Sequence, residues 1–415
     1  SIAQGRFRSR KRPFRFQIAA ARGLGFDTAM NAIEQIHQAL CQDDPALFRS
    51  ALASEPGLKA RVNEPLGPFD SPLINSVRSP GMLDAVLEAG ADINARSRWW
   101  AGSFGLLDGA SDELAAYAIQ RGAVLDPNSA ARLGLIDPLR EFLAVDPNAA
   151  RHRGGDGQTP LHVARNVEIA ALLLEHGAEI NALDVDHEST PVQYAIGDRQ
   201  PVAAFLIERG ANSDIFAAAA LGDAGLARTH LDADPECVRR CVDAEDFPME
   251  NPRAGGAIYQ WTLGFYMTPC QVAAKFGRED LLKLLFERSP EEVRLLNACL
   301  VGDEMQAGRL ASPELVKKLS ERERKHLAHA ARNNDDRAVR LMVQAGFPLD
   351  SRGQHFATPL HWAAWHGNSA SVALLLAAGA DPELLDRDFR LNSLGWARHG
   401  EKNSWFRAQG RYPET

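Results

Sequence analysis

The sequence predicts an all-α protein: a solenoid of about eleven stacked helix pairs with one long inserted finger. Three observations lead to this fold class. A short Thr-Pro or Ser-Pro motif recurs at intervals of roughly 33 residues. Several copies are followed by an apolar stretch that ends in glycine. Aromatic residues make up only 7% of the chain, and Ala and Leu dominate the apolar set, which suits thin layers of short helices.

Composition places the chain among globular proteins and excludes several classes. It has 415 residues, of which 45% are hydrophobic and 24% charged, with a net charge of −8. An acidic chain is not a nucleic-acid binder by overall electrostatics. Five Cys without a CxxC pair disfavour a disulfide framework, and no apolar run is long enough to span a membrane. We therefore expect a cytoplasmic protein.

Residues 1–31 form a basic start that we interpret as a solvated helical lead-in. Seven basic residues and no acidic one precede Asp27: Arg6, Arg8, Arg10, Lys11, Arg12, Arg15 and Arg22. The same pattern is compatible with a transit peptide or with a basic arm that contacts nucleic acid or anionic lipid. This arm is the one part of the chain for which nucleic acid remains an alternative partner.

Five strongly marked helix pairs follow the Thr-Pro or Ser-Pro motif. They begin at Ser71-Pro72-Leu73, Thr159-Pro160-Leu161-His162, Thr190-Pro191-Val192, Thr268-Pro269-Cys270 and Thr358-Pro359-Leu360-His361. Thr before Pro suits an N-cap, because Pro at the first helical position loses no useful N–H. We expect Gly90, Gly177, Gly210, Gly346 and Gly379 to end the second helices in a left-handed conformation.

Weaker copies fill the intervals between these pairs. They cover residues 32–58, 103–126, 129–150, 216–235, 292–319 and 325–350, and a final first helix is expected at 393–400. None of these helices buries its apolar face alone, so stacked neighbours must supply the core.

The motif copies resemble the ankyrin repeat. The stretch TPLHVARNVEIAALLLEHGAEINALD, opened by Thr159, and TPLHWAAWHGNSASVALLLAAGADPELLD, opened by Thr358, carry the likeness most fully. The resemblance implies an ankyrin block over residues 32–242, a second over 268–415, and a structural role for His162 and His361, which would tie one loop to the next. A finer likeness, in RSRWWAGSFGLLDGA and GGAIYQWTLG, is to an uncharacterised bacterial subfamily.

Residues 243–267 interrupt the period as an inserted finger. A loop this long inside a regular array is usually functional or disordered. Apolar residues alternate from Ile258 to Leu263 after Gly255-Gly256, and this alternation predicts a strand and hence an ordered finger.

Candidate binding residues lie at the expected loop tips and in the finger. They are Trp99, Trp100, Asp156, Asp186, His187, Glu188, Arg253, Tyr259 and Trp261. Adjacent tryptophans at an exposed tip are costly unless they pack or bind. The Asp186-His187-Glu188 tip, with Asp184 nearby, suits acid–base chemistry, a carboxylate–histidine metal set, or simply a polar turn. The finger residues suit a lid over the groove, although Trp261 could instead anchor the finger to the array.

Our leading hypothesis is a scaffold that binds a protein or peptide in the concave groove formed by inner helices and tips. Acidic tips (Asp156, Asp186 and Glu188) favour a basic partner. The alternative is an enzyme or small-molecule receptor between the finger and the tips, with His187, Asp186, Glu188 and Tyr259 as catalytic candidates. No phosphate-binding glycine loop and no nucleophile elbow occur. We therefore favour the scaffold over the enzyme and expect no cofactor and no metal.

Two tryptophans occupy equivalent positions on successive first helices near the C-terminus. Trp362 and Trp396 either stack along the inner wall as a site for an apolar group or pack in the core of the last layer. Core packing is the favoured interpretation.

Overall fold

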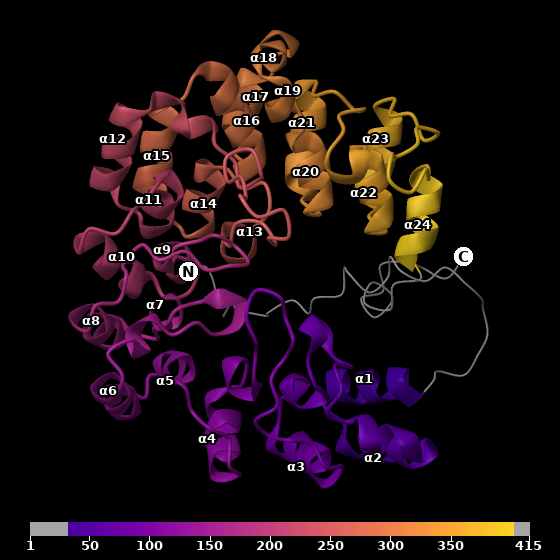
Figure 1. Ribbon diagram of the computed structural model, residues 1–415. Coiled ribbons are helices and arrows are strands. Elements are labelled where there is room, and N and C mark those ends of the chain that lie inside the picture. Colours follow the sequence, from indigo (N-terminus) through magenta and orange to yellow (C-terminus); the bar gives the residue numbers. More distant parts are fainter. Residues whose placement is uncertain (1–31, 402–415) are drawn as a thin grey trace, which may run out of the picture. The chain divides into compact units, whose positions relative to one another are not determined.

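The computed structural model describes residues 32–401, which divide into two compact units that meet in sequence at Leu161 and His162 (Figure 1). The lead-in predicted for residues 1–31 lies outside the described residues.

The first unit holds short helix pairs whose first members are partly 3₁₀ turns. Its α-helices are α1 (Ala32–Gln42), α2 (Pro45–Ser54), α3 (Pro80–Glu88), α4 (Asp112–Gln120), α5 (Pro127–Leu133) and α6 (Ile136–Val145), and α7 (Pro160–Val163) crosses the boundary. Its 3₁₀ turns are η1 (Pro56–Arg61), η2 (Pro68–Asp70), η3 (Leu73–Ser76), η4 (Leu106–Asp108), η5 (Ala149–Arg151) and η6 (Gly155–Gly157). The turns η3 and η4 stand where the sequence predicts full first helices, ahead of α3 and α4.

The second unit contains the most regular pairs. Its α-helices are α8 (Val167–Glu175), α9 (Pro191–Ala195), α10 (Gln200–Glu208), α11 (Ile215–Leu221), α12 (Ala224–Ala233), α13 (Tyr259–Thr262), α14 (Pro269–Lys275), α15 (Glu279–Arg288), α16 (Glu291–Val301), α17 (Glu304–Leu310), α18 (Pro313–Lys318), α19 (Glu321–Arg324), α20 (His326–Arg332), α21 (Asp336–Ala345), α22 (Pro359–Trp365), α23 (Ser369–Ala377) and α24 (Ser393–Glu401), with 3₁₀ turns η7 (Pro235–Arg239) and η8 (Gln354–Phe356). No strand occurs among the described residues, so the all-α prediction is confirmed.

Local capping explains why the helices begin and end where the sequence predicts. Thr190, Thr268 and Thr358 are N-caps whose side chains accept a hydrogen bond from the backbone N–H three residues later. The predicted glycines after the second helices all have positive φ: Gly90, Gly177, Gly210, Gly346 and Gly379. Both signals act over a few residues only, which is why they can be read from the sequence.

First helices stack on one another and form the core of the second unit. Helix α11 packs on α14, α14 on α16, α20 on α22, and α22 on α24. Every residue from Ile215 to Ala220 in α11 is buried, because alanine lets neighbouring helices approach closely. Trp362 and Trp396 are 3% and 4% exposed and meet edge to face at 4.8 Å, so the core interpretation of this pair is confirmed.

Two buried histidines connect successive tips, as the sequence predicts. His162 Nε2 lies 3.0 Å from Ser189 O, and His361 Nε2 lies 3.1 Å from Leu391 O. A carbonyl oxygen only accepts, so Nε2 is the protonated nitrogen in both rings. Each first helix therefore holds the loop that precedes the next one.

The predicted strand in the finger is wrong. Residues 259–262 form the single helical turn α13, which packs on α9. Tyr259 and Leu263 lie four residues apart and are both buried, whereas Trp261 is 46% exposed. A single helical turn can place some of these side chains in the core and others in solvent, as a strand would. The apolar pattern therefore did not distinguish a helical turn from a strand.

Across residues 32–401, the helices are all too short or too polar to cross a lipid bilayer.

Candidate functional site

The tip over residues 184–189 is a tight turn organised by one buried aspartate. The Asp184 carboxylate accepts hydrogen bonds from the backbone N–H of His187 at 2.9 Å, from that of Ser189 at 2.8 Å, and from the Tyr194 hydroxyl at 2.9 Å. Burial raises the pKa of Asp184, although these donors oppose the shift. Glu188 closes the turn with φ of +44°. Asp184 therefore serves the turn, as the polar-turn interpretation expects.

The finger docks directly on this tip. The Gly255 N–H donates to Asp186 O at 2.8 Å, and His187 Nδ1 donates to Gly256 O at 2.7 Å. The Glu188 carboxylate accepts from the backbone N–H groups of Glu250 and Asn251, both at 2.7 Å. Three consecutive tip residues thus hold two separate stretches of the finger.

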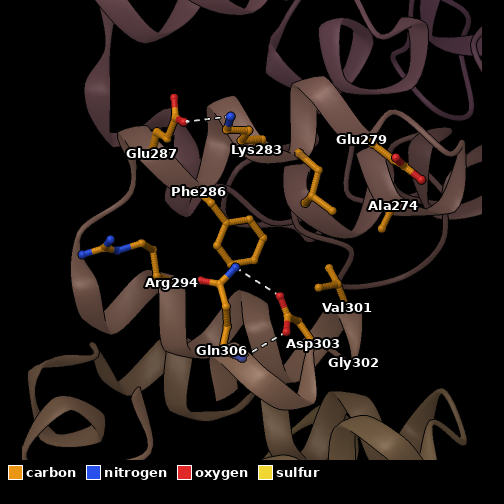
Figure 2. A pocket seen from close by; sticks show the side chains of 11 residues that line it. Ala274, Glu279, Lys283, Phe286, Glu287, Arg294, Val301, Gly302, Asp303 and Gln306 are labelled. Carbon is orange, nitrogen blue, oxygen red and sulfur yellow. Dashed lines mark hydrogen bonds and ion pairs between the residues drawn. The ribbon is translucent and has the colours of Figure 1, made fainter. Parts of the chain in front are cut away.

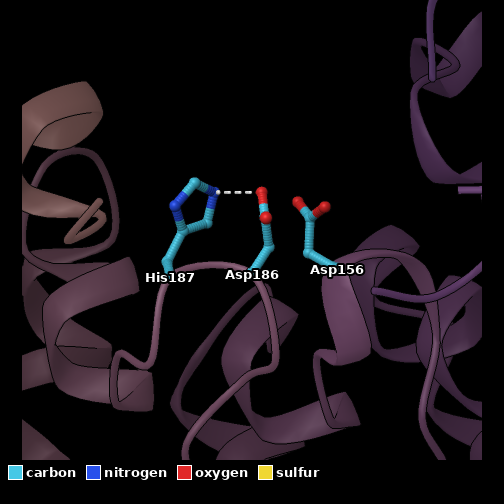
Figure 3. Close-up of side chains that lie close together, drawn as sticks. All are labelled: Asp156, Asp186 and His187. Atoms are coloured by element: carbon cyan, nitrogen blue, oxygen red, sulfur yellow. Dashed lines mark ion pairs between the residues drawn. The ribbon is translucent and has the colours of Figure 1, made fainter. Parts of the chain in front are cut away.

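Asp186 and His187 form a buried pair instead of an exposed acid–base dyad. They are 5% and 7% exposed, and Asp186 Oδ2 lies 3.6 Å from His187 Nε2 (Figure 3, which also draws Asp156 of the first unit). Burial raises the pKa of Asp186. A Cβ built at Gly255 would lie 3.1 Å from Asp186 Oδ2, so the finger backbone already contacts the pair.

A metal set made of Asp184, Asp186, His187 and Glu188 is not supported by these contacts. Asp184 and Glu188 direct their carboxylates at backbone N–H groups, one inside the turn and one in the finger. Their oxygens do not converge on the imidazole.

Tyr259 is a core residue, so it is not available as the lid or catalytic group considered from the sequence. It is 1% exposed, and its hydroxyl donates to Asp214 Oδ1 at 3.1 Å. Phe247 packs edge to face on its ring at 5.4 Å. Burial raises the pKa of Tyr259 well above its usual value, which keeps the hydroxyl neutral. This side chain anchors the finger to α11.

The base of the finger is closed by backbone bonds and by arginine. Val242 N–H donates to Met267 O at 3.0 Å, and Tyr266 N–H donates to Val242 O at 2.9 Å. Arg322 pairs with Asp243 at 2.8 Å and also contacts the Asp246 carboxylate. These contacts hold both ends of the insertion together, so the prediction of an ordered finger is confirmed.

Comparison with known proteins identifies the repeats. The family model described as ankyrin repeats (3 copies) matches residues 128–217 and 272–386. The chain contains ankyrin repeats. Among solved structures, it is similar to the human ASB11 ankyrin repeat domain, at 20% identity and a TM-score of 0.29, over 70% of this chain and 100% of that one.

Two known proteins match short segments of the chain. A calmodulin-binding transcription activator CBT from Oryza sativa subsp. japonica is 52% identical over 48 residues, which is 12% of this chain and 5% of that protein. The palmitoyltransferase Hip14 of Drosophila melanogaster is 43% identical over 60 residues, or 14% and 9% of the two chains. The chain therefore spans only a small part of these relatives.

In the first unit, the tryptophan tip is partly engaged by neighbouring residues. Trp99 Nε1 donates to Asp156 Oδ1 at 3.0 Å, and the Trp99 ring meets Phe69 edge to face at 5.0 Å. Trp99 and Trp100 are both half-buried, and their rings are 6.2 Å apart. Packing thus accounts for Trp99 and for the Asp156 carboxylate.

The sequence reasoning missed a group of exposed tip residues near the C-terminal end of the second unit. They are Phe356, Arg387, Phe389 and Arg390, together with the half-buried Arg352 beside them. The available signal was the fixed offset of tips after each Thr-Pro-Leu-His motif. Aligning DVDHES at 184–189 with DRDFRL at 386–391 would have shown that the first tip is acidic, whereas the second has Phe389 and Arg390 where the first has His187 and Glu188.

Proposed function

We propose that this ankyrin-repeat protein binds another protein or a peptide through the tips and inner helices of its repeats. Ankyrin repeats generally mediate protein–protein interaction. The observation that carries the proposal is the docked finger: the tip at 184–189 holds an irregular segment through two side chains and one backbone carbonyl. Tips built in the same way are suited to holding a segment of a partner.

Among the binding residues predicted from the sequence, we propose as partner contacts those that are at least partly exposed to solvent. Trp261 is 46% exposed and meets Phe265 edge to face at 5.2 Å, and Arg253 is exposed on the finger. Trp100 is half-buried at the first unit's tip. Aromatic and arginine side chains commonly dominate the binding energy of protein interfaces. Asp186, His187 and Glu188 support this surface by holding the finger.

Site-specific photo-crosslinking tests the proposal. A photoreactive phenylalanine analogue replaces Trp261 in the full chain, which is then exposed to lysate of the native host. The matched control carries the analogue at Met305, which is 82% exposed on α17. We expect a protein to crosslink at position 261 and not at 305. Equal crosslinking at both positions, or none at either, would contradict binding through this surface.

The small-molecule or enzyme alternative gains no support from a specific observation. It places a site between the finger and the tip at 186–188, where the finger backbone lies directly on the side chains. The hollow in Figure 2, of about 480 Å³, lies instead among α15, α16 and α17. Its lining is rich in charged side chains, including Glu279, Lys283 and Arg294, whereas ligand pockets are predominantly apolar.

A further inference from the structure

The tip at residues 386–391 repeats the hydrogen bonds of the tip that docks the finger. Asp386 N–H donates to Leu391 O at 3.0 Å, as Asp184 N–H does to Ser189 O at 3.2 Å. The Asp386 carboxylate accepts from the backbone N–H of Phe389 at 2.6 Å and from that of Leu391 at 3.0 Å. Trp396 Nε1 donates to the same carboxylate at 2.8 Å, in the place of the Tyr194 hydroxyl. The two turns are therefore the same structure.

This equivalence assigns a counterpart to each residue that contacts the finger. Asp388 corresponds to Asp186, Phe389 to His187, and Arg390 to Glu188. Arg390 has φ of +55°, close to the +44° of Glu188, so the backbone positions match.

The chemistry of the two tips is inverted. Glu188 accepts hydrogen bonds from backbone N–H groups, whereas arginine at the same position donates and carries a positive charge. His187 is 7% exposed beneath the finger, whereas Phe389 is 54% exposed. A segment held at 386–391 must therefore supply acceptors, carboxylates above all, together with an apolar group for Phe389.

The neighbouring tip adds two guanidinium groups and a second exposed ring. Phe356 is 48% exposed, with Arg352 at 5.5 Å and Arg387 at 5.4 Å from its ring centroid. Arg387 also lies 3.4 Å from the Asp388 carboxylate. The guanidinium groups of Arg352 and Arg387 thus border the exposed ring of Phe356.

Phe356 holds this position at a conformational cost. Its φ is +59°, and the equivalent residue in the tip at 154–158 is Gly157, with φ of +71°. The tips match because Gly353 N–H donates to Ala357 O as Gly154 N–H does to Gln158 O. A left-handed backbone strains a non-glycine residue, because its Cβ approaches the following carbonyl oxygen. An exposed aromatic ring that is retained at this cost is consistent with a contact role.

We propose that Arg352, Phe356, Arg387, Phe389 and Arg390, here called the C-terminal tip surface, bind an acidic peptide segment of a partner protein. The segment carries glutamate or aspartate interleaved with aromatic or large aliphatic side chains. This inference rests on the proposed function and reverses the basic partner that the acidic tips suggested. A nucleic acid fits less well, because the chain has a net charge of −8 and its acidic surface would repel an extended polyanion.

Fluorescence polarisation on the full chain tests the proposal. The probe is a fluorescein-labelled synthetic peptide of alternating glutamate and tryptophan. The comparison probes are the same peptide with lysine for glutamate and a labelled oligothymidylate. We expect the acidic peptide to bind at least about tenfold more tightly than the lysine peptide. We also expect its affinity to fall as salt rises.

Two variants separate contact from folding. Arg390→Glu should weaken acidic-peptide binding by about tenfold or more. The matched control is Arg209→Glu, because Arg209 is exposed and stacks at 4.6 Å on Phe205 on an outer helix. Phe356→Gly should also weaken binding while leaving the unfolding temperature unchanged or higher, because glycine relieves the left-handed strain. If Phe356 had a purely structural role, Phe356→Gly would lower the unfolding temperature and leave peptide binding unchanged.

Several outcomes would overturn the proposal. They are equal binding of the lysine peptide, undiminished binding by Arg390→Glu, and tighter binding of the oligothymidylate. A dimer in solution that Arg390→Glu dissociates would assign the surface to a second copy of the chain. Crosslinking at position 261 separates this inference from the proposed function. If crosslinking persists while the acidic peptide fails to bind, this inference fails and the protein-binding function stands.

Discussion

At the scale of single residues, buried histidines connect packing with pH. His361 has a partner for each ring nitrogen: Thr358 Oγ1 donates to Nδ1 at 2.7 Å, and Nε2 donates to Leu391 O. His326 is different, because it is 3% exposed and its buried Nδ1 has no hydrogen-bond partner. Burial, reinforced by the nearby Arg322 charge, lowers the pKa of His326 to about 4.

This lowered pKa predicts a specific loss of stability in acid. In the unfolded chain the His326 imidazole takes up a proton near pH 6.5, whereas in the folded chain it does so only near pH 4. Between these values the unfolded state binds more protons, so the free energy of unfolding falls as pH falls. The wild type should lose free energy of unfolding between pH 7 and pH 5, and we expect His326→Leu to reduce that loss by up to about 2 kcal/mol. Urea unfolding at the two pH values measures it.

The control for this prediction is an exposed histidine. His176→Gln, at the end of α8, should leave the pH dependence as it is in the wild type. His329 is also buried and its pKa is lowered in the same direction, so part of the acid sensitivity should remain in His326→Leu. A pH dependence that His326→Leu does not change would contradict the assignment.

At the scale of elements, the finger depends on its anchor points more than on its own secondary structure. Its one helical turn, α13, has four residues, and Lys275 Nζ donates to the carbonyl oxygen of Leu263 just beyond it at 2.5 Å. Glu188, Asp214 and Asn333 bind it from three different repeats: Glu188 accepts from its backbone, Asp214 accepts from Tyr259, and Asn333 donates to Phe265 O at 3.1 Å. The finger is thus ordered by the array that it crosses.

Removing the Glu188 charge should therefore loosen the finger locally. Glu188→Gln weakens two charge-assisted hydrogen bonds to the backbone N–H groups of Glu250 and Asn251. We expect the free energy of local opening at these amides to fall by about 1–2 kcal/mol. Hydrogen exchange followed by mass spectrometry on peptides that cover residues 245–256 measures the change.

A second glutamate in the same unit supplies the comparison. Glu175 is exposed at the end of α8, and Glu175→Gln should not alter exchange in the finger. If the finger amides exchanged at the wild-type rate in Glu188→Gln as well, the finger would be held by its other anchors alone.

At the scale of the whole molecule, one arginine ties together parts of the chain that are distant in sequence. In the second unit, Arg239 of η7 pairs with Glu292 of α16 and with Glu323 of α19, each at 2.6 Å. The Glu323 side chain is 6% exposed, and its carboxylate contacts both this guanidinium and the Ser320 N–H. The triad thus connects the segment that precedes the insertion with two of the helices that follow it.

Breaking this triad should lower global stability. Arg239→Met leaves two carboxylates without their guanidinium, one of them buried, and we expect the free energy of unfolding to fall by about 2 kcal/mol or more. Urea unfolding measures it. Arg288→Met, which removes an exposed pair with Asp232, should cost less than about 1 kcal/mol. Equal losses in the two variants would show that the triad acts as an ordinary surface ion pair.

The repeat register, the helix caps and the histidine ties were predictable from the sequence. Thr358 caps α22 three residues before His361, and Gly379 closes the pair shortly after α23, so each signal lies within one repeat. Such signals are local, and a chain that carries them at regular spacing has one way to bury its apolar faces. The presence of the finger was predictable for the same reason, because it interrupts a known period. Its order was predicted from an alternation interpreted as a strand, and the structure has a helical turn there instead.

Whether a tip is used within the molecule or left exposed was not predictable from the sequence. Glu188 and Arg390 occupy the same turn at equivalent positions, yet Glu188 is used within the molecule and Arg390 is exposed. The difference comes from residues 250–258, which follow Glu188 by some sixty positions and fold back onto its tip. Local rules carry no information on such a long-range contact, because its stability depends on where several repeats place their side chains together. Which charges remain for a partner is therefore decided only when the chain has folded.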